Sequence, residues 1–294
     1  MAELQVRELH PGFGAEITGL RPEIPLDDGT VRQLRELFDE RGLLVFRDLD
    51  IEAPFQRYLA HVLIGQEPPA DPAPGTSPDE ATRRQFMFVS NKEPGGGAPY
   101  GRLLFHCDMM WSERPHQALS LYGVDVEQPN VPTLFVSMGY GWDTLPDDLR
   151  TRGEHLHAVH GHDATYPNRG GDDDVIDSVF EQSKKTTTPV ARPHPRTGRT
   201  MLYVSQQVTL EIEELSPEDN EEVLEALFAH LYDPARVFEH DWRNGDLVIW
   251  DNQAIQHARP NVRTEAPVRT LRKVFAPIPE PLDPRLQPRF SKVG

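Results

Sequence analysis

Two short segments that lie far apart in the chain carry residue types that bind transition metals. His106 and Asp108 form a His-x-Asp pair, and His257 follows the segment from Gly245 to Asn252. Two imidazoles and one carboxylate make the facial triad that holds non-haem Fe(II) and leaves other coordination positions open. His106, Asp108 and His257 are therefore the predicted metal ligands and the predicted catalytic residues.

The segment around the His-x-Asp pair reads as a strand. Because side chains alternate along a strand, His106 and Asp108 would share one face, and Cys107 would face the other way as a small buried residue. The pair alone is weak evidence, because it occurs often by chance and fits an ordinary surface or structural pair. The distal segment favours a metal site, because it supplies a third candidate ligand, His257.

The distal segment has a buried strand followed by a turn. Residues 248–250 are apolar, and Asp251-Asn252 is a turn signal. His257 would then lie just beyond a strand end, where loops on a rigid scaffold often carry functional residues.

A second group of histidines is a competing candidate for a metal site. His155 and His157 are two residues apart in a segment expected to be helical, so their side chains would diverge. We therefore interpret the whole group as a helix end and a loop. The group comprises His155, His157, His160 and His162, with Asp163 beside it.

The elements that must position these residues are mostly short strands. Many short strands with a few peripheral helices predict a mainly β fold with a double-sheet jelly roll, in one domain over residues 1–294. Strands are expected at 86–90, 103–106, 118–124, 133–137, 200–204, 247–250 and 269–276, and helices at 31–38, 54–64, 145–156 and 216–231.

Residues 163–190 interrupt this pattern. The segment is polar, with adjacent glycines, an acidic triplet and no apolar period, so it cannot bury much surface alone. Long loops of this kind are often active-site lids. We expect a mobile lid here.

Composition limits the possible partners. The formal net charge of −17 argues against nucleic acid and anionic membranes, although an acidic surface often means only solubility. The single cysteine, the lack of a recognisable signal peptide and the lack of a long apolar stretch make the cytoplasm the expected compartment. A small molecule is the expected partner, and a homo-oligomer is possible.

The motifs in their order resemble the TauD/TfdA family of Fe(II)/2-oxoglutarate-dependent dioxygenases over nearly the whole chain. The Gly-Asp-x-x-x-Trp-Asp-Asn string is the most specific of them. The matching segments are 106–108, 132–133, 194–199, 202–204, 244–252 with His257, and Arg269.

This resemblance implies a double-stranded β-helix core (jelly-roll, cupin-like) with Fe(II) held by His106, Asp108 and His257. It implies 2-oxoglutarate and O2 as co-substrates, with Arg269 gripping the distal carboxylate and Thr133 helping to hold it. Guanidinium fits a carboxylate bidentately, which agrees with that role. A surface charge at 269 and a plain strand threonine at 133 are the alternatives.

The implied reaction oxidises an unactivated C–H bond, most often by hydroxylation, and releases succinate and CO2. The expected substrate is a small organic acid, an amino-acid derivative or a biosynthetic intermediate. Net desaturation, C–S or C–O cleavage, and a non-catalytic jelly-roll binding or sensor protein are the alternatives.

The substrate residues are harder to identify. Lys273 has the strand parity of Arg269 and would hold an anionic or zwitterionic substrate as a point charge. Met110 has the parity of Asp108, although core packing is an alternative for it. The candidate substrate-binding residues are Lys273, Met110 and Asn91.

Overall fold

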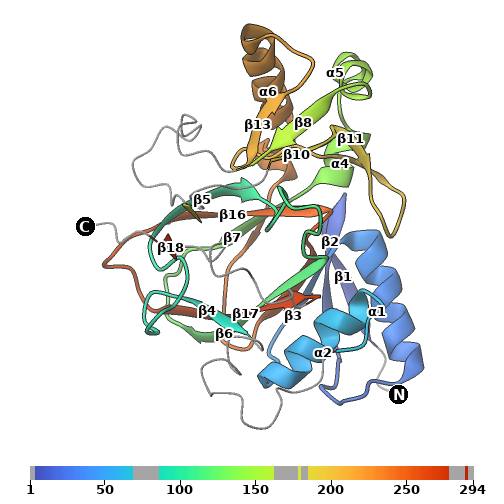
Figure 1. Ribbon diagram of the computed structural model, residues 1–294. Helices are drawn as coiled ribbons and strands as arrows, with labels where there is room; N and C mark the ends of the chain where they lie inside the picture. The colour runs from blue at the N-terminus through green and yellow to red at the C-terminus, as the bar shows by residue number, and fades with distance from the viewer. Residues whose placement is uncertain (1–3, 69–85, 162–177, 180–184, 278–288, 291–294) are drawn as a thin grey trace.

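The structure, a computed structural model, describes residues 4–68, 86–161, 178–179, 185–277 and 289–290. Its framework is a seven-stranded sheet that lies opposite a four-stranded sheet (Figure 1). In spatial order the larger sheet contains β1 (Gln5–His10), β2 (Phe13–Thr18), β3 (Leu43–Phe46), β15 (Leu247–Asp251), β6 (Ala118–Val126), β17 (Arg269–Ala276) and β4 (Met87–Ser90). The smaller sheet contains β14 (Phe238–His240), β7 (Thr133–Ser137), β16 (Ile255–Val262) and β5 (Gly101–His106).

Large apolar side chains from both sheets form one buried cluster. Leu121 and Trp250 come from the larger sheet and Phe135 from the smaller one, and the rings of Phe135 and Trp250 meet edge to face with centroids 5.4 Å apart. Burying a side chain of this size stabilises the fold by roughly 1.5–3 kcal/mol. The alternation of side chains along each strand therefore joins the sheets into the predicted jelly roll.

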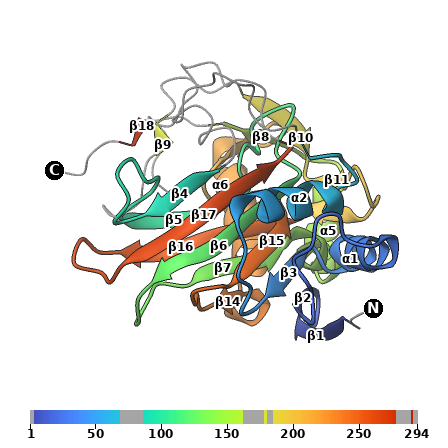
Figure 2. The same ribbon diagram turned by 90° about the horizontal axis from the view of Figure 1, so that it is seen from below.

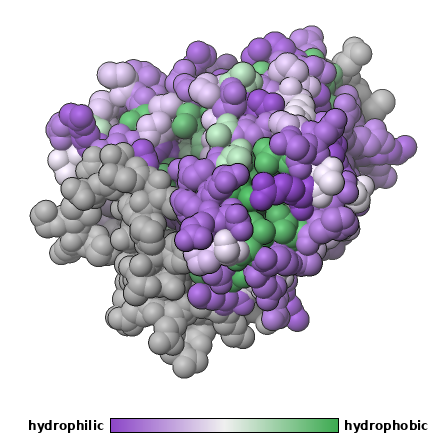
Figure 3. All heavy atoms as spheres, turned by 90° about the horizontal axis from the view of Figure 1, so that it is seen from above, coloured by the Kyte–Doolittle hydropathy of each residue, from purple (hydrophilic) through white to green (hydrophobic). Residues whose placement is uncertain are grey.

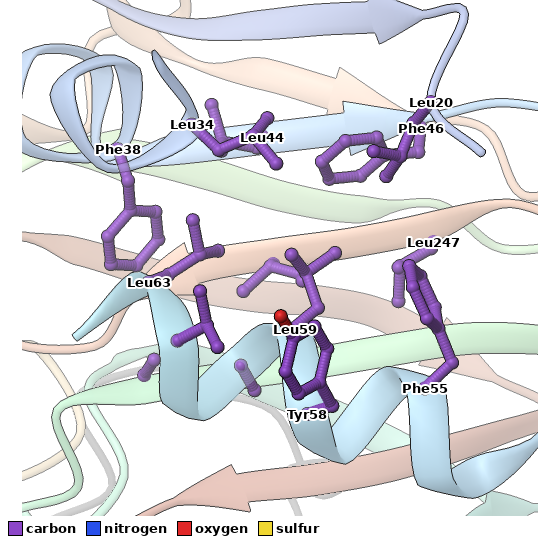
Figure 4. Packing of buried hydrophobic residues seen from close by; sticks show 14 of the residues in the cluster. Leu20, Leu34, Phe38, Leu44, Phe46, Phe55, Tyr58, Leu59, Leu63 and Leu247 are labelled. Carbon is purple, nitrogen blue, oxygen red and sulfur yellow. The ribbon is translucent and has the colours of Figure 1, made fainter. Parts of the chain in front are cut away.

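Two helices cover the outer face of the larger sheet (Figure 2). They are α1 (Asp28–Arg41) and α2 (Ala53–Leu63). The Asp27 side chain caps α1 by accepting from Thr30 N at 3.0 Å. Gly42 ends α1 in the left-handed conformation, with φ of 68°, and its N–H bonds to Phe38 O. Figure 4 shows the buried hydrophobic cluster that these helices share with the sheet.

A second group of elements lies beside the smaller sheet, at the top of Figure 1. A small sheet and α6 bury their own apolar cluster there. The elements of this region are α4 (Met138–Asp143), α5 (Asp147–Gly153), β8 (His157–His160), β10 (Thr186–Pro189), β11 (Ala191–Pro193), β12 (Thr200–Leu202), β13 (Thr209–Ile212), α6 (Pro217–Leu231) and the 3-10 turn η1 (Pro234–Arg236). Two further short strands, β9 (Ser178–Val179) and β18 (Arg289–Phe290), pair with each other.

Several elements depart from the sequence expectations. The helix expected at 145–156 is the shorter α5, and His157 begins strand β8 instead. Strand β16 was not expected. The proposed lid at 163–190 lies largely outside the described residues, but its last part, 186–189, is strand β10 and pairs with β8.

One face of the molecule shows how polar and apolar residues are distributed. Figure 3 shows a face that is mostly hydrophilic, with a hydrophobic area near its centre. Within the described residues, no helix combines the length and the apolar character that crossing a membrane requires.

Candidate active site

Strands β5 and β16 bring the two distant histidines together. In the antiparallel register His106 lies opposite His257, and their ring centroids are 4.2 Å apart. The Nε2 atom of His106 lies 3.4 Å from Asp108 Oδ1, and the Nε2 atom of His257 lies 3.7 Å from the same oxygen. One donor atom from each of the three residues falls within 4.8 Å of the others. The predicted triad is thus assembled in space.

The routes by which Asp108 and His257 reach the site differ from the sequence expectation. Strand β5 ends at His106, so Asp108 lies in a turn, and Met109 after it has a left-handed φ of 62°. His257 is the third residue of β16, inside a strand and not in a loop. The prediction that His106 and Asp108 lie on one face of a strand was therefore wrong, because Asp108 lies in the turn after the strand.

Asn252 fixes that turn. Its Oδ1 accepts from Asp108 N at 2.9 Å, and its Nδ2 donates to Asp108 O at 2.8 Å and to His116 O at 3.1 Å. Asn252 is fully buried, so these bonds are not shared with bulk water. The sequence showed Asn252 only as a turn former, although an asparagine after a buried strand can bind two backbone groups at once.

A second network holds the residue before Asn252. Asp251 Oδ2 lies 3.1 Å from His194 Nε2 and also accepts from the Arg196 guanidinium, which bonds to Asp39 of α1 as well. Although burial alone would raise the pKa of Asp251, His194 and Arg196 lower it. This network joins α1, the β11–β12 turn and the end of β15, and it was not predicted from the sequence.

The surroundings of the two imidazoles suit a metal ligand set. His106 Nδ1 lies 2.7 Å from Leu104 O, a carbonyl that can only accept, so this contact orients the ring with Nε2 facing Asp108. Burial, and next the charge of His106, hold the pKa of His257 well below its usual range, so His257 is a neutral imidazole. Two imidazoles and a carboxylate are the donor set that Fe(II) takes in facial triads.

Asp108 is ionised. Burial alone would raise its pKa, but the Lys273 ammonium and the two imidazoles hold that pKa well below its usual range. Lys273 Nζ contacts Asp108 Oδ2 directly and lies 5.2 Å from the centre of the Phe275 ring. The structure thus brings Lys273, the candidate substrate residue on β17, to the edge of the triad.

Arg269 and Thr133 also meet. Arg269 Nη2 donates to Thr133 Oγ1 at 3.2 Å, and Arg269 Nε donates to Val131 O at 3.2 Å. No carboxylate among the described residues forms an ion pair with Arg269. Burial, helped by the charge of nearby Arg259, lowers the pKa of Arg269 to about 9. A buried guanidinium in this state gains from an anionic ligand.

The remaining predicted residues have other surroundings. Asn91 Oδ1 accepts from Arg269 N at 2.9 Å and its Nδ2 donates to Pro267 O at 2.9 Å, so its amide holds the start of β17. Met110 is fully buried and packs in one cluster with Cys107. We predicted that Met110 shares a strand face with Asp108, and this was wrong because residues 108–110 form a turn.

The second histidine group disperses. His157 is partly exposed and lies 2.6 Å from Glu214 Oε1, whereas His160 is buried between the hydroxyls of Thr188 and Thr209. Within the described residues, only the 106, 108 and 257 set brings three such side chains together as possible metal ligands. His162 and Asp163 lie outside the described residues.

Known proteins resemble this chain over most of its length. The family model described as taurine catabolism dioxygenase TauD, TfdA family matches residues 5–275. Pentalenolactone F synthase of Streptomyces avermitilis is 29% identical, with 92% of this chain and 93% of that protein covered. The (S)-phenoxypropionate/alpha-ketoglutarate-dioxygenase of Sphingobium herbicidovorans is 27% identical, with 86% and 88% covered.

The solved structures agree on the fold. A taurine dioxygenase from Burkholderia xenovorans superposes with a TM-score of 0.72 at 22% identity and covers 92% of this chain and 90% of its own. At that identity the match supports the jelly-roll architecture alone, and the family match carries the assignment. The chain therefore belongs to the TauD/TfdA family of Fe(II)- and 2-oxoglutarate-dependent dioxygenases.

Proposed function

We propose that His106, Asp108 and His257 hold the Fe(II) of this dioxygenase, and that the enzyme hydroxylates a small organic anion. The convergence of the three donor atoms within 4.8 Å of one another is the observation that carries this proposal, and the strand β17 that brings Lys273 to Asp108 also carries the buried Arg269. A non-catalytic sensor would bind the same groups but would not release succinate in response to a substrate.

The chain supplies binding and orientation, and bound iron supplies the oxidising chemistry with O2 and 2-oxoglutarate. Arg269 has a planar fork whose free N–H groups match the distal carboxylate of 2-oxoglutarate. The Thr133 hydroxyl accepts a hydrogen bond from Arg269 and would donate its own proton to the same carboxylate. Because Arg269 and Thr133 are both buried, the carboxylate they bind would be shielded from water, which strengthens each bond.

Lys273 gives the best indication of the substrate. Its ammonium contacts Asp108 and its side chain is 13% exposed, so it lies at the site without being closed off from it. A lysine binds an anion as a point charge. The (S)-phenoxypropionate in the name of one relative is an organic anion with an aromatic body. We therefore propose that Lys273 holds the substrate's acidic group, and that the reaction takes place in the cytoplasm.

A succinate-release screen tests this proposal. Purified enzyme with Fe(II), 2-oxoglutarate and O2 would be offered small organic acids, amino-acid derivatives and matched neutral amides. A true substrate should raise succinate release and give a product one oxygen atom heavier by mass spectrometry. A product lighter by two hydrogens would instead establish net desaturation.

Lys273→Met then tests the acidic group. The KM for the acid should rise about tenfold or more, because the loss of one charge-assisted contact costs about 1.5–3 kcal/mol, while a neutral analogue should be little affected. Lys92→Met is the matched control, because Lys92 forms an ion pair with Asp125 on the surface. Equal effects of Lys273→Met on the acid and on its amide would contradict the proposed role.

A further inference from the structure

The Thr133 hydroxyl receives two hydrogen bonds. Trp242 Nε1 donates to Thr133 Oγ1 at 2.9 Å, and Arg269 Nη2 donates to the same atom at 3.2 Å. A hydroxyl has two acceptor lone pairs and one proton. With both lone pairs engaged, the only bond that Thr133 Oγ1 can still make is one that its own proton donates.

Trp242 is held firmly in this position. Its side chain is fully buried, and its carbonyl oxygen accepts from Gln128 Nε2 and from Asn130 Nδ2, each at 2.9 Å. Its ring lies edge-on to His240, with centroids 4.5 Å apart, and His240 pairs with Thr133 between β14 and β7. The indole N–H therefore has a fixed direction, towards Thr133.

The same short segment also fixes Arg269. Val131 O accepts from Arg269 Nε at 3.2 Å, two residues before Thr133. Trp242 and Arg269 are thus both hydrogen-bonded to the segment of residues 128–133. The two groups that face the anion, a guanidinium and a hydroxyl, depend on one shared scaffold.

We propose that Trp242 is a positioning residue for 2-oxoglutarate, acting through Thr133. By donating to Oγ1, the indole directs the hydroxyl proton of Thr133 away from itself and from Arg269, towards the carboxylate that Arg269 binds. This inference rests on the proposed roles of Arg269 and Thr133 in binding the co-substrate.

Calorimetric binding of 2-oxoglutarate to the anaerobic, Mn(II)-loaded protein tests the inference without turnover. Trp242→Phe removes the N–H and keeps an aromatic ring, and it should raise the Kd by about fivefold to tenfold, the range of one hydrogen bond. Trp242→Met, a large side chain without a hydrogen-bond donor, is the second variant if Trp242→Phe folds poorly. Trp142→Phe, in a separate core cluster, is the matched control and should bind as the wild type does.

A double-mutant cycle separates positioning from loosened packing. In a Thr133→Val background the hydroxyl is absent, so Trp242→Phe should cause no further loss of affinity. Binding of 2-oxobutanoate, which lacks the distal carboxylate, should be unaffected by Trp242→Phe. The KM for 2-oxoglutarate in turnover should rise while kcat stays near the wild-type value.

The outcomes distinguish this inference from the function on which it rests. A loss of affinity in Thr133→Val with none in Trp242→Phe would overturn the role of Trp242 alone. An equal effect of Trp242→Phe in both backgrounds would also overturn it. Wild-type affinity in Thr133→Val and in Arg269→Leu would overturn the proposed co-substrate site itself.

Discussion

His106 and Asp108 are each held by a group outside the ligand set. Leu104 O orients the ring of His106, and the Asn252 amide bonds to both backbone polar groups of Asp108. Such outer groups set the tautomer and direction of a metal ligand before the metal arrives. The affinity of the site for iron should therefore depend on residues that never contact it.

Asn252→Ala tests that dependence. The substitution removes the partner of the part-buried N–H and C=O of Asp108 and of the buried carbonyl of His116, so the free energy of unfolding should fall by about 2–3 kcal/mol. Fe(II) affinity should fall about tenfold or more, as expected when an outer group of a metal site is lost. Urea unfolding and anaerobic Fe(II) titration measure the two effects. Unchanged iron affinity would show that Asn252 serves stability alone.

Arg269→Leu tests the proposed co-substrate arginine. The change removes the fork and should raise the KM for 2-oxoglutarate by about a hundredfold, since an unpaired buried carboxylate costs a few kcal/mol. Simple 2-oxo acids without a distal carboxylate should be affected much less, and Fe(II) affinity should stay close to the wild-type value. Similar losses for both kinds of 2-oxo acid would argue against this assignment.

At the scale of elements, the strands with apolar alternation could be predicted and β16 could not. Strand β16 buries polar side chains whose bonds depend on distant residues. Gln256 donates to Val204 O and accepts from Tyr232, and Arg259 donates to the carbonyls of residues 98, 100 and 101. A strand with buried polar groups lacks the apolar period that marks a strand in sequence.

The candidate site divides in the same way. The residue types and order of His106, Asp108, His257 and Arg269 were visible in the motifs. The contacts of Asn252, Trp242 and Arg196 were not, because each links segments that only the folded chain brings together.

His160 provides a test of the region built from β8, β10 and β13. Burial, and next the charge of Arg192, lower the pKa of His160 to about 3, against an ordinary value of 6.5. Between these two values the unfolded chain binds a proton at His160 and the folded chain does not. The free energy of unfolding should therefore fall as the pH drops from about 6.5 towards 3. The loss should not exceed several kcal/mol, at about 1.4 kcal/mol per pKa unit.

His160→Gln isolates this contribution. The glutamine amide can still bond to a threonine hydroxyl but does not titrate in this range, so the variant should show a flatter dependence of unfolding free energy on pH. Urea unfolding between pH 7 and pH 4 measures the difference. Parallel curves for the two proteins would mean that His160 has the same pKa in the folded and the unfolded chain, which would contradict the lowered pKa.

At the scale of the whole molecule, the candidate site forms where the two sheets meet. His106, His257 and Thr133 come from the smaller sheet, whereas Arg269 and Lys273 come from β17 of the larger one. The aromatic and aliphatic core between the sheets therefore sets the spacing between the iron ligands and the cationic residues. This arrangement follows from the jelly roll that the strand pattern predicted.

We propose that His106, Asp108 and His257 hold the iron that couples the oxidation of 2-oxoglutarate to the oxidation of the substrate. Anaerobic Fe(II) binding followed by substrate-dependent succinate release, in Asp108→Ala beside Cys107→Ala, tests it most directly. Asp108→Ala should weaken iron binding and abolish coupled succinate formation, because one of three protein ligands is lost. Cys107→Ala, which alters a neighbouring buried residue packed in one cluster with Met110 and Met138, should bind iron nearly as the wild type does. Wild-type turnover in Asp108→Ala would show that Asp108 is not an iron ligand and would contradict the proposed triad.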